Sequence, residues 1–176
     1  MGTPKALIRL GDSTFLETII KKHHDAGIIT PVVLVADFLE DEIIKQNIKD
    51  IDLVVCSPPE KTPIESLRRG ITQLDADKDG FIYHPIDFPL PLSETIRMLM
   101  DGFVESGKAI VKPSYKSKGG HPIILSTSLI GEIMEASEDT GLREVVRKDR
   151  DRVLSIPTDD EGVVRNINTP DDLVDV

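Results

Sequence analysis

The side chain best placed to do chemistry is that of Asp87, which ends the apolar run Gly80-Phe-Ile-Tyr-His-Pro-Ile-Asp. Such a run, continuing into Asp-x-Pro, places a carboxylate at the carboxyl end of a strand, where open α/β folds bind ligands. Carboxylates held there commonly bind a Mg²⁺ ion that carries nucleotide phosphates. For Asp87 taken alone, the alternative is an aspartate that only caps a turn.

A second set of oxygen ligands lies near the end of the chain, in Asn166-Ile-Asn168-Thr-Pro170. We expect a strand over 163–167 and a helix from Pro170, so this junction can face the same sheet edge as Asp87. An asparagine carbonyl is a hard oxygen ligand, and Asn168 can share Mg²⁺ with Asp87 without adding charge. A helix cap is the alternative role for Asn168.

Two glycine-containing segments suit phosphate or cofactor contacts. Met1-Gly2-Thr-Pro-Lys5 combines a glycine turn with an ammonium that can contact phosphate oxygens, although a solvated terminal lysine is the alternative. In Gly119-Gly120-His121, the glycines allow close approach of the backbone to a ligand. His121 can then donate a hydrogen bond to a phosphate or a pterin-like group; a hairpin turn with a structural histidine is the alternative.

The elements that position these residues alternate along the chain. We expect strands at 31–36, 51–56, 109–113, 122–125, 153–156 and 163–167, and in the run that ends at Asp87. We expect helices from Thr14 toward Gly27, at 39–48, 64–74, 93–103 (capped by Ser93), 129–136 and 141–148, and from Pro170. This alternation predicts an α/β fold with a largely parallel sheet.

Composition narrows the class of protein. A chain of 176 residues suits a single domain over 1–176. The formal net charge of −10 argues against nucleic acid or an anionic membrane as a partner, so bound phosphates would need local lysines or a metal. The single cysteine, Cys56, excludes an internal disulfide, and no stretch has the length of a membrane span. We therefore expect a cytoplasmic protein.

Five motifs in a fixed order resemble those of the MobA-like nucleotidyltransferases, and most of all the molybdenum cofactor cytidylyltransferases. They are Met-Gly-x-x-Lys ending at Lys5, Ser-Leu-x-x-Gly from Ser66 to Gly70, Asp-x-Pro from Asp87, Gly-His-Pro from Gly120, and Asn-x-Asn-Thr-Pro from Asn166. The resemblance covers essentially the whole chain.

This resemblance implies a three-layer, Rossmann-like fold of the glycosyltransferase-A type with a mostly parallel mixed sheet. It implies Mg²⁺-dependent transfer of CMP from CTP to molybdopterin, with release of pyrophosphate. The implied roles are metal binding by Asp87 and Asn168, catalysis by Lys5 and Asp87, nucleotide binding by Gly2, Lys5, Ser66 and Gly70, and acceptor binding by Gly120 and His121. Such transfers depend on positioning and charge neutralisation rather than on a protein nucleophile.

The chain departs from the family at its start. The family has a strand and a loop of the form Leu-Ala-Ala-Gly-x-Ser-x-Arg before Met-Gly-x-x-Lys, whereas this sequence begins at that methionine. We expect a gap in the middle of the sheet with unpaired strand edges. Our hypothesis is that Met1 is an internal methionine of the natural protein; the alternative is that another segment or a second chain fills the gap.

Other functions stay open. Asn166-x-Asn168 resembles the guanylyltransferase branch, so a GTP-dependent enzyme acting on molybdopterin or another phosphorylated acceptor is an alternative. A catalytically inactive accessory protein is another. A molybdoenzyme apoprotein as partner, and an oligomer, are further possibilities.

Overall fold

The computed structural model describes residues 4–56, 60–75, 77–168 and 170–173. Its helices are α1 (Phe15–Asp25), α2 (Glu40–Lys45), α3 (Pro63–Ile71), α4 (Ser93–Ser106), α5 (Ile130–Glu135) and α6 (Leu142–Lys148). Its strands are β1 (Arg9–Leu10), β2 (Ser13–Thr14), β3 (Val32–Ala36), β4 (Asp52–Cys56), β5 (Gly80–Tyr83), β6 (Ile110–Tyr115), β7 (Lys118–Gly119), β8 (Ile123–Ser126) and β9 (Val153–Pro157). Short 3₁₀-helices cover Lys5–Leu7, Asp37–Leu39, Thr127–Leu129, Glu161–Val164 and Pro170–Leu173.

The predicted α/β fold with a mixed sheet is confirmed, with more antiparallel pairing than we expected. β3 pairs with β4 and β6 with β9 in parallel, whereas the β5–β8, β8–β6 and β6–β7 pairs are antiparallel. The chain returns from β6 to β7 through a tight turn at Lys116 and Ser117, and a turn that short can join only antiparallel strands.

Local sequence explains where two of the helices begin. The Thr14 side chain accepts a hydrogen bond from the Glu17 amide at 3.2 Å, and the Glu17 carboxylate accepts one from the Thr14 amide at 2.6 Å. This capping box satisfies amides that have no partner within the helix, so it fixes the start of α1. Thr62 and Glu65 form the same box at α3, and Pro63 occupies its first turn.

Two element predictions were wrong. The segment 163–167 contains no strand; it overlaps the 3₁₀-helix Glu161–Val164, and its apolar character reflects the burial of Val163 and Ile167. Ser93 does not cap α4, because the capping residue is Leu92. The carboxylate of Asp160 instead accepts hydrogen bonds from the Leu92 amide at 2.8 Å and from the Thr95 hydroxyl at 2.7 Å.

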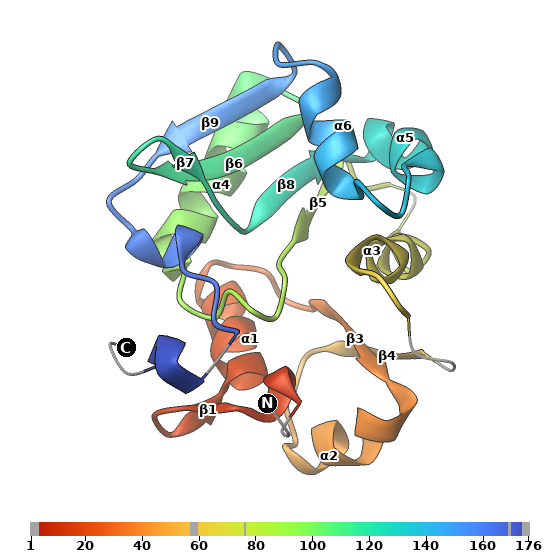
Figure 1. The fold of residues 1–176 in the computed structure, drawn as a ribbon, viewed down its shortest axis with the longest axis vertical. Helices are drawn as coiled ribbons and strands as arrows, with labels where there is room; N and C mark the ends of the chain where they lie inside the picture. Colours follow the sequence, from red (N-terminus) through yellow and green to blue (C-terminus); the bar gives the residue numbers. More distant parts are fainter. Residues whose placement is uncertain (1–3, 57–59, 76, 169, 174–176) are drawn as a thin grey trace.

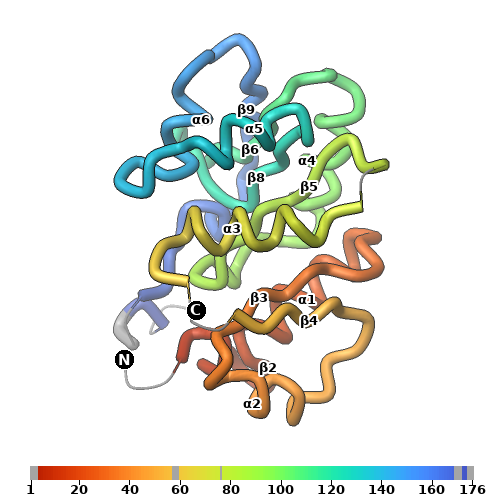
Figure 2. The backbone as a smooth tube through the Cα atoms, turned by 90° about the vertical axis from the view of Figure 1, so that its right-hand side faces the viewer, coloured from red at the N-terminus to blue at the C-terminus, as the bar shows by residue number. Residues whose placement is uncertain are grey.

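The strands lie in two main parts that no described strand pairing joins. β3 and β4 form a two-stranded sheet with α1 and α2 nearby, while β5, β8, β6, β7 and β9 form the larger sheet (Figures 1 and 2). Leu16, Ile20 and Val33 belong to the apolar core of the first part, and Ile110 and Leu125 to that of the second.

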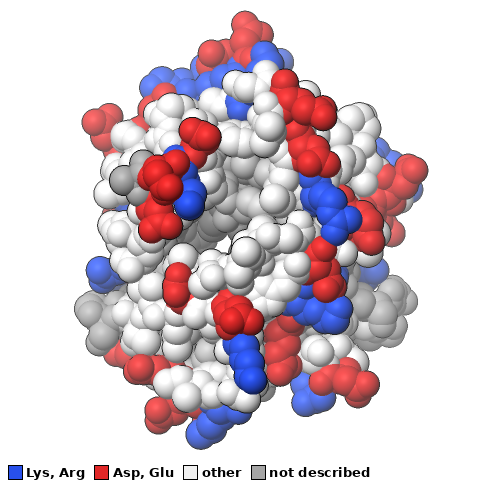
Figure 3. Space-filling model, turned by 180° about the vertical axis from the view of Figure 1, so that it is seen from behind, with Lys and Arg blue, Asp and Glu red and all other residues white. Residues whose placement is uncertain are grey.

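A cavity of about 970 Å³ separates these two sheets. Its walls include every residue of 30–36 and of 80–87. Since alternate residues of a strand point to opposite faces, a lining made of consecutive residues means that the strand edges border the cavity. Figure 3 shows a hollow across the middle of the molecule, with walls formed mainly by uncharged residues.

This cavity agrees with the gap that we expected from the sequence. A water molecule takes up roughly 30 Å³ of liquid, and protein interiors contain few voids larger than one water. β3 pairs with β4 alone and β5 with β8 alone, so each strand has a second edge without a partner strand among the described residues.

No helix in the described ranges is both long and apolar enough to cross a membrane.

Candidate active site

The predicted metal ligands and the predicted lysine meet in one hydrogen-bonded chain. Asn166 Nδ2 donates to Asp87 Oδ2 at 2.8 Å, and Asn168 Nδ2 donates to Asn166 Oδ1. Lys5 Nζ donates to Asn168 Oδ1 at 2.5 Å and lies 3.8 Å from Asp87 Oδ2. The first residues, the β5 loop and the last residues of the described chain therefore converge on one carboxylate.

The loop after β5 is held so that the Asp87 carboxylate reaches this cluster. The Ile167 amide donates to the Asp87 carbonyl at 2.8 Å, and the Phe88 amide donates to the Pro85 carbonyl at 3.1 Å. The Asp87 side chain remains 23% exposed and that of Lys5 34%, so a solvated ligand can reach both.

The donor set suits a divalent metal that keeps water and phosphate ligands. Among the described residues, no group of three His, Cys, Asp or Glu side chains is arranged to hold a metal ion. Asp87 would supply the carboxylate, with Asn168 nearby as a neutral oxygen donor. Mg²⁺ is commonly held by one or two carboxylates together with waters and substrate phosphates, and this site fits that pattern.

The predicted nucleotide-binding residues lie along the large cavity. Ser66 and Gly70 of α3 line it, as do Lys5 and Asp87. A Cβ added at Gly70 would lie 3.2 Å from Leu34 Cδ1, so this glycine also lets α3 pack closely on β3. Gly2, the remaining nucleotide-binding prediction, lies outside the described residues.

The predicted acceptor motif lies beside the Asp87 loop. The His121 ring packs against Phe88 with ring centroids 4.6 Å apart, and its buried Nδ1 has no hydrogen-bond partner among the described residues. Burial lowers the pKa of His121, and the charge of Asp87 partly opposes that shift. Gly120 is required sterically, since an added Cβ would lie 2.2 Å from the Val163 carbonyl oxygen.

Sequence reasoning overlooked several residues that contact the Asp87 loop. Asn166 belonged to a recognised motif but was given no role, although it binds the Asp87 carboxylate directly. His84 stood inside the run that ends at Asp87 and was not singled out; its Nε2 lies 2.8 Å from the Phe88 carbonyl oxygen. A histidine within an apolar run was the available signal.

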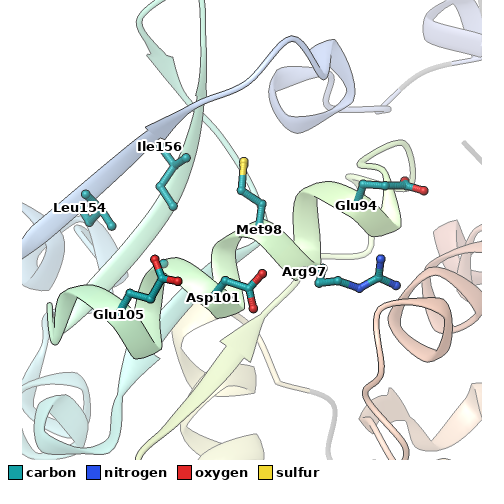
Figure 4. Close-up of a pocket in the computed structure, with 8 residues that line it drawn as sticks. Glu94, Arg97, Met98, Asp101, Glu105, Leu154 and Ile156 are labelled. Atoms are coloured by element: carbon teal, nitrogen blue, oxygen red, sulfur yellow. The ribbon is translucent and has the colours of Figure 1, made fainter.

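A second hollow, of about 540 Å³, lies between α4 and β9 (Figure 4). Glu94, Asp101 and Glu105 line it, and Arg97 is the one cation among the described residues of its lining. Three carboxylates repel a triphosphate, so this hollow is not the candidate active site.

A carboxylate, an ammonium and two amides gather beside β5 of a Rossmann-like α/β fold. This arrangement suits the positioning and charge neutralisation on which nucleotidyl transfer depends. The model of the MobA-like NTP transferase domain matches residues 1–153, and the chain belongs to that family. Comparison with curated protein sequences gave no match.

Solved structures show the same fold. Rv0371c from Mycobacterium tuberculosis H37Rv, in complex with manganese, is 23% identical with a TM-score of 0.84, covering 99% of this chain and 94% of that chain. A cytidylyltransferase from Leptospira borgpetersenii serovar Hardjo-bovis (strain JB197) is 16% identical with a TM-score of 0.74, covering 96% and 76%. The molybdopterin-guanine dinucleotide biosynthesis protein A of Archaeoglobus fulgidus is 17% identical with a TM-score of 0.69, covering 98% and 88%.

Proposed function

We propose that residues 1–176 act as one nucleotidyltransferase domain that transfers CMP from CTP to molybdopterin, with Mg²⁺ as the metal. The observation that carries this proposal is the contact chain from Lys5 through Asn168 and Asn166 to Asp87. It provides positive charge for a polyphosphate and a carboxylate for a metal within one cluster. We also propose a cytoplasmic location, which rests on the single cysteine.

In the proposed reaction an acceptor phosphate oxygen attacks the α-phosphorus of the nucleotide, and the bond to the bridging oxygen of pyrophosphate breaks. Lys5 offsets the negative charge that develops on the leaving pyrophosphate, and Asp87 and Asn168 would hold Mg²⁺. When bound, Mg²⁺ supplies Lewis-acid polarisation of the phosphate. Ser66, Gly70 and Gly2 would contact the nucleotide.

The acceptor side of the proposal rests on Gly120 and His121. His121 has a buried ring nitrogen without a partner among the described residues, and its ring contacts Phe88, next to Asp87. A pterin or phosphate acceptor that received or supplied a hydrogen bond there would lie beside the proposed metal site.

GTP is the second candidate nucleotide, because the paired Asn166 and Asn168 resemble the guanylyltransferase branch. The experiment offers [α-³²P]CTP and [α-³²P]GTP separately with molybdopterin and Mg²⁺ to the wild-type chain and to Asp87→Asn. We expect labelled product from CTP, and a loss of about 100-fold or more in Asp87→Asn because a charged metal ligand is removed. Label from GTP alone would replace the CTP proposal with the GTP one.

An inactive accessory protein is the third candidate, and the open cavity between β3 and β5 is the observation that favours it. If wild type and Asp87→Asn both form no product with either nucleotide, and wild type still binds molybdopterin in equilibrium dialysis, this third candidate is the correct one.

A further inference from the structure

The backbone carbonyls of residues 87–90 each accept a hydrogen bond. The donor to Phe88 is His84, directly after β5, and the donors to the other three come from distant parts of the chain. The Asp87 carbonyl binds the Ile167 amide, and the Phe88 carbonyl binds His84 Nε2, both at 2.8 Å. The carbonyls of Pro89 and Leu90 both bind Lys22 Nζ, at 2.8 Å each.

From this geometry we propose that Lys22, His23 and His84 form a carbonyl clamp, whose task is to position Asp87. None of the three touches the Asp87 carboxylate in the described contacts, so they act as positioning residues. The metal-binding consequence rests on the proposed function, whereas the effect on the loop itself does not.

The hydrogen bonds that join the two histidines to the Phe88 carbonyl have a defined donor-to-acceptor direction. His84 Nε2 faces a carbonyl oxygen, which can only accept, so Nε2 carries the proton. In the neutral ring Nδ1 is then an acceptor, and it lies 2.8 Å from His23 Nε2, which must donate. His23 is 5% exposed and belongs to α1, so the core helix fixes the ring that holds the Phe88 carbonyl.

Lys22, which belongs to the same helix, binds the next two carbonyls. A partly buried ammonium needs acceptors in place of water, and the Pro89 and Leu90 carbonyls supply them. The neighbouring Lys21 is different: its side chain is 74% exposed and pairs with Asp25 on the surface. Lys22 and His23, adjacent in α1, thus account directly or through His84 for three of the four held carbonyls.

Fixing these carbonyls fixes the peptide planes that carry Asp87. A carboxylate that binds a metal must be held to within about 0.5 Å of its productive position, and supporting hydrogen bonds supply that accuracy. The loop contains Pro85, Pro89 and Pro91, which lack amide donors, so fewer amides than carbonyls are available for side chains to hold it.

The test compares paired variants of the full chain. Lys22→Met is paired with Lys21→Met, and His23→Leu with His24→Leu, whose half-buried ring lies 3.3 Å from the Asp50 carbonyl oxygen. His84→Leu is paired with His84→Gln, because a glutamine amide can still donate to the Phe88 carbonyl. Backbone amide exchange at Ile86, Asp87 and Phe88 reports on the loop, and exchange at Val111 in β6 reports on the whole fold.

We expect Lys22→Met, His23→Leu and His84→Leu to speed exchange at Asp87 and Phe88 by about tenfold or more while Val111 is unchanged. We expect Mn²⁺, titrated by calorimetry, to bind these variants about 10- to 100-fold more weakly. Lys21→Met and His24→Leu should match wild type, and His84→Gln should recover most of the loss.

Wild-type exchange at Asp87 and Phe88 in both Lys22→Met and His84→Leu overturns the clamp, whatever the activity. The clamp is also overturned if every variant, His84→Gln included, loses exchange protection at Val111 as well as in the loop. The residues would then support the whole fold rather than the loop. A wild-type chain that binds Mn²⁺ but transfers no nucleotide contradicts the proposed function and leaves the clamp intact.

Discussion

Asn166 and Asp87, far apart in sequence, are joined by a hydrogen bond of 2.8 Å from Nδ2 to Oδ2. Oδ2 also lies 3.8 Å from Lys5 Nζ, so one carboxylate oxygen is oriented by both an amide and an ammonium. A residue near the end of the described chain thus orients a carboxylate on the β5 loop, and Asn166 becomes part of the proposed metal site.

We expect Asn166→Ala to weaken Mn²⁺ binding by about 10- to 100-fold, because outer hydrogen bonds orient the atoms that bind a metal. Calorimetric titration measures the Mn²⁺ affinity. The control is Gln73→Ala, a surface substitution shortly after the end of α3. Unchanged Mn²⁺ affinity in Asn166→Ala would show that the hydrogen bond has no part in metal binding.

Two glycines should respond to alanine in opposite directions. An added Cβ at Gly120 meets the backbone of Val163 at 2.2 Å, so Gly120→Ala should destabilise the fold by about 3 kcal/mol or more. Gly131 lies in α5 with no atom within 4 Å of an added Cβ, so Gly131→Ala should stabilise it by about 0.5–1 kcal/mol. Urea unfolding curves measure both, and equal midpoints for the two variants would be inconsistent with these contacts.

Stability should fall with acidification well above the range in which carboxylates titrate. Burial lowers the pKa of His23 to about 4, helped by the nearby His24, and that of His84 to about 3, helped by His23, from an ordinary value of 6.5. The unfolded chain therefore binds protons first, below pH 6.5, while the folded chain takes them up only near pH 3–4. The free energy of unfolding is unaffected above pH 6.5 and decreases as the pH falls below it, by about 3 kcal/mol for each histidine by pH 4.

Unfolding midpoints measured in urea from pH 7 to pH 5 check this dependence. The double variant His23→Leu/His84→Leu should flatten the wild-type slope. An identical slope in the double variant would assign the pH dependence to other groups.

The cavity between the sheets predicts that an added apolar strand will stabilise the protein. We expect an extension before Met1, about five apolar residues followed by Gly-x-Ser-x-Arg, to raise the Tm by about 10 °C. Burying two apolar side chains contributes about 3–6 kcal/mol, and each kcal/mol corresponds to about 2–4 °C for a domain of this size.

Differential scanning calorimetry measures the Tm, and the control extension carries serine in place of the apolar residues. Slower amide exchange at Val33 and Phe81 should accompany the gain, because both strand edges border the cavity. Equal Tm values for the apolar and serine extensions would show that no strand enters.

The features that sequence predicted well depend on neighbouring residues. A helix was predicted from Thr14, and the structure explains this start by the capping box that Thr14 forms with Glu17, three positions further on. The strands β3 and β4 could be predicted because both are short apolar runs between turn residues. At the site, the motif order led us to group Lys5, Asp87 and Asn168, and the structure places Lys5 against both of the others; their roles stay predictions.

The features that could not be predicted from the sequence depend on contacts between residues far apart in the chain. Asp160 caps α4 from 65 residues away at Thr95, and no local pattern replaces that contact. Lys22 and His84 bind main-chain carbonyls, which every residue possesses, so no partner residue type marks the contact in the sequence. The antiparallel order of β5 and β8 likewise depends on chain reversal between strands rather than on their composition.

The division of the strands into two sheets has a consequence for how the protein unfolds. In the described chain, no continuous ladder of strand pairs connects the β3–β4 part to the larger sheet. Helix packing and side-chain contacts, such as that of Lys22 with Pro89, connect the two parts instead. A structure joined in this way can lose one part while the other persists. Unfolding should therefore be less cooperative than that of a one-sheet protein, with the β3–β4 part opening first and calorimetric and spectroscopic transitions that do not coincide.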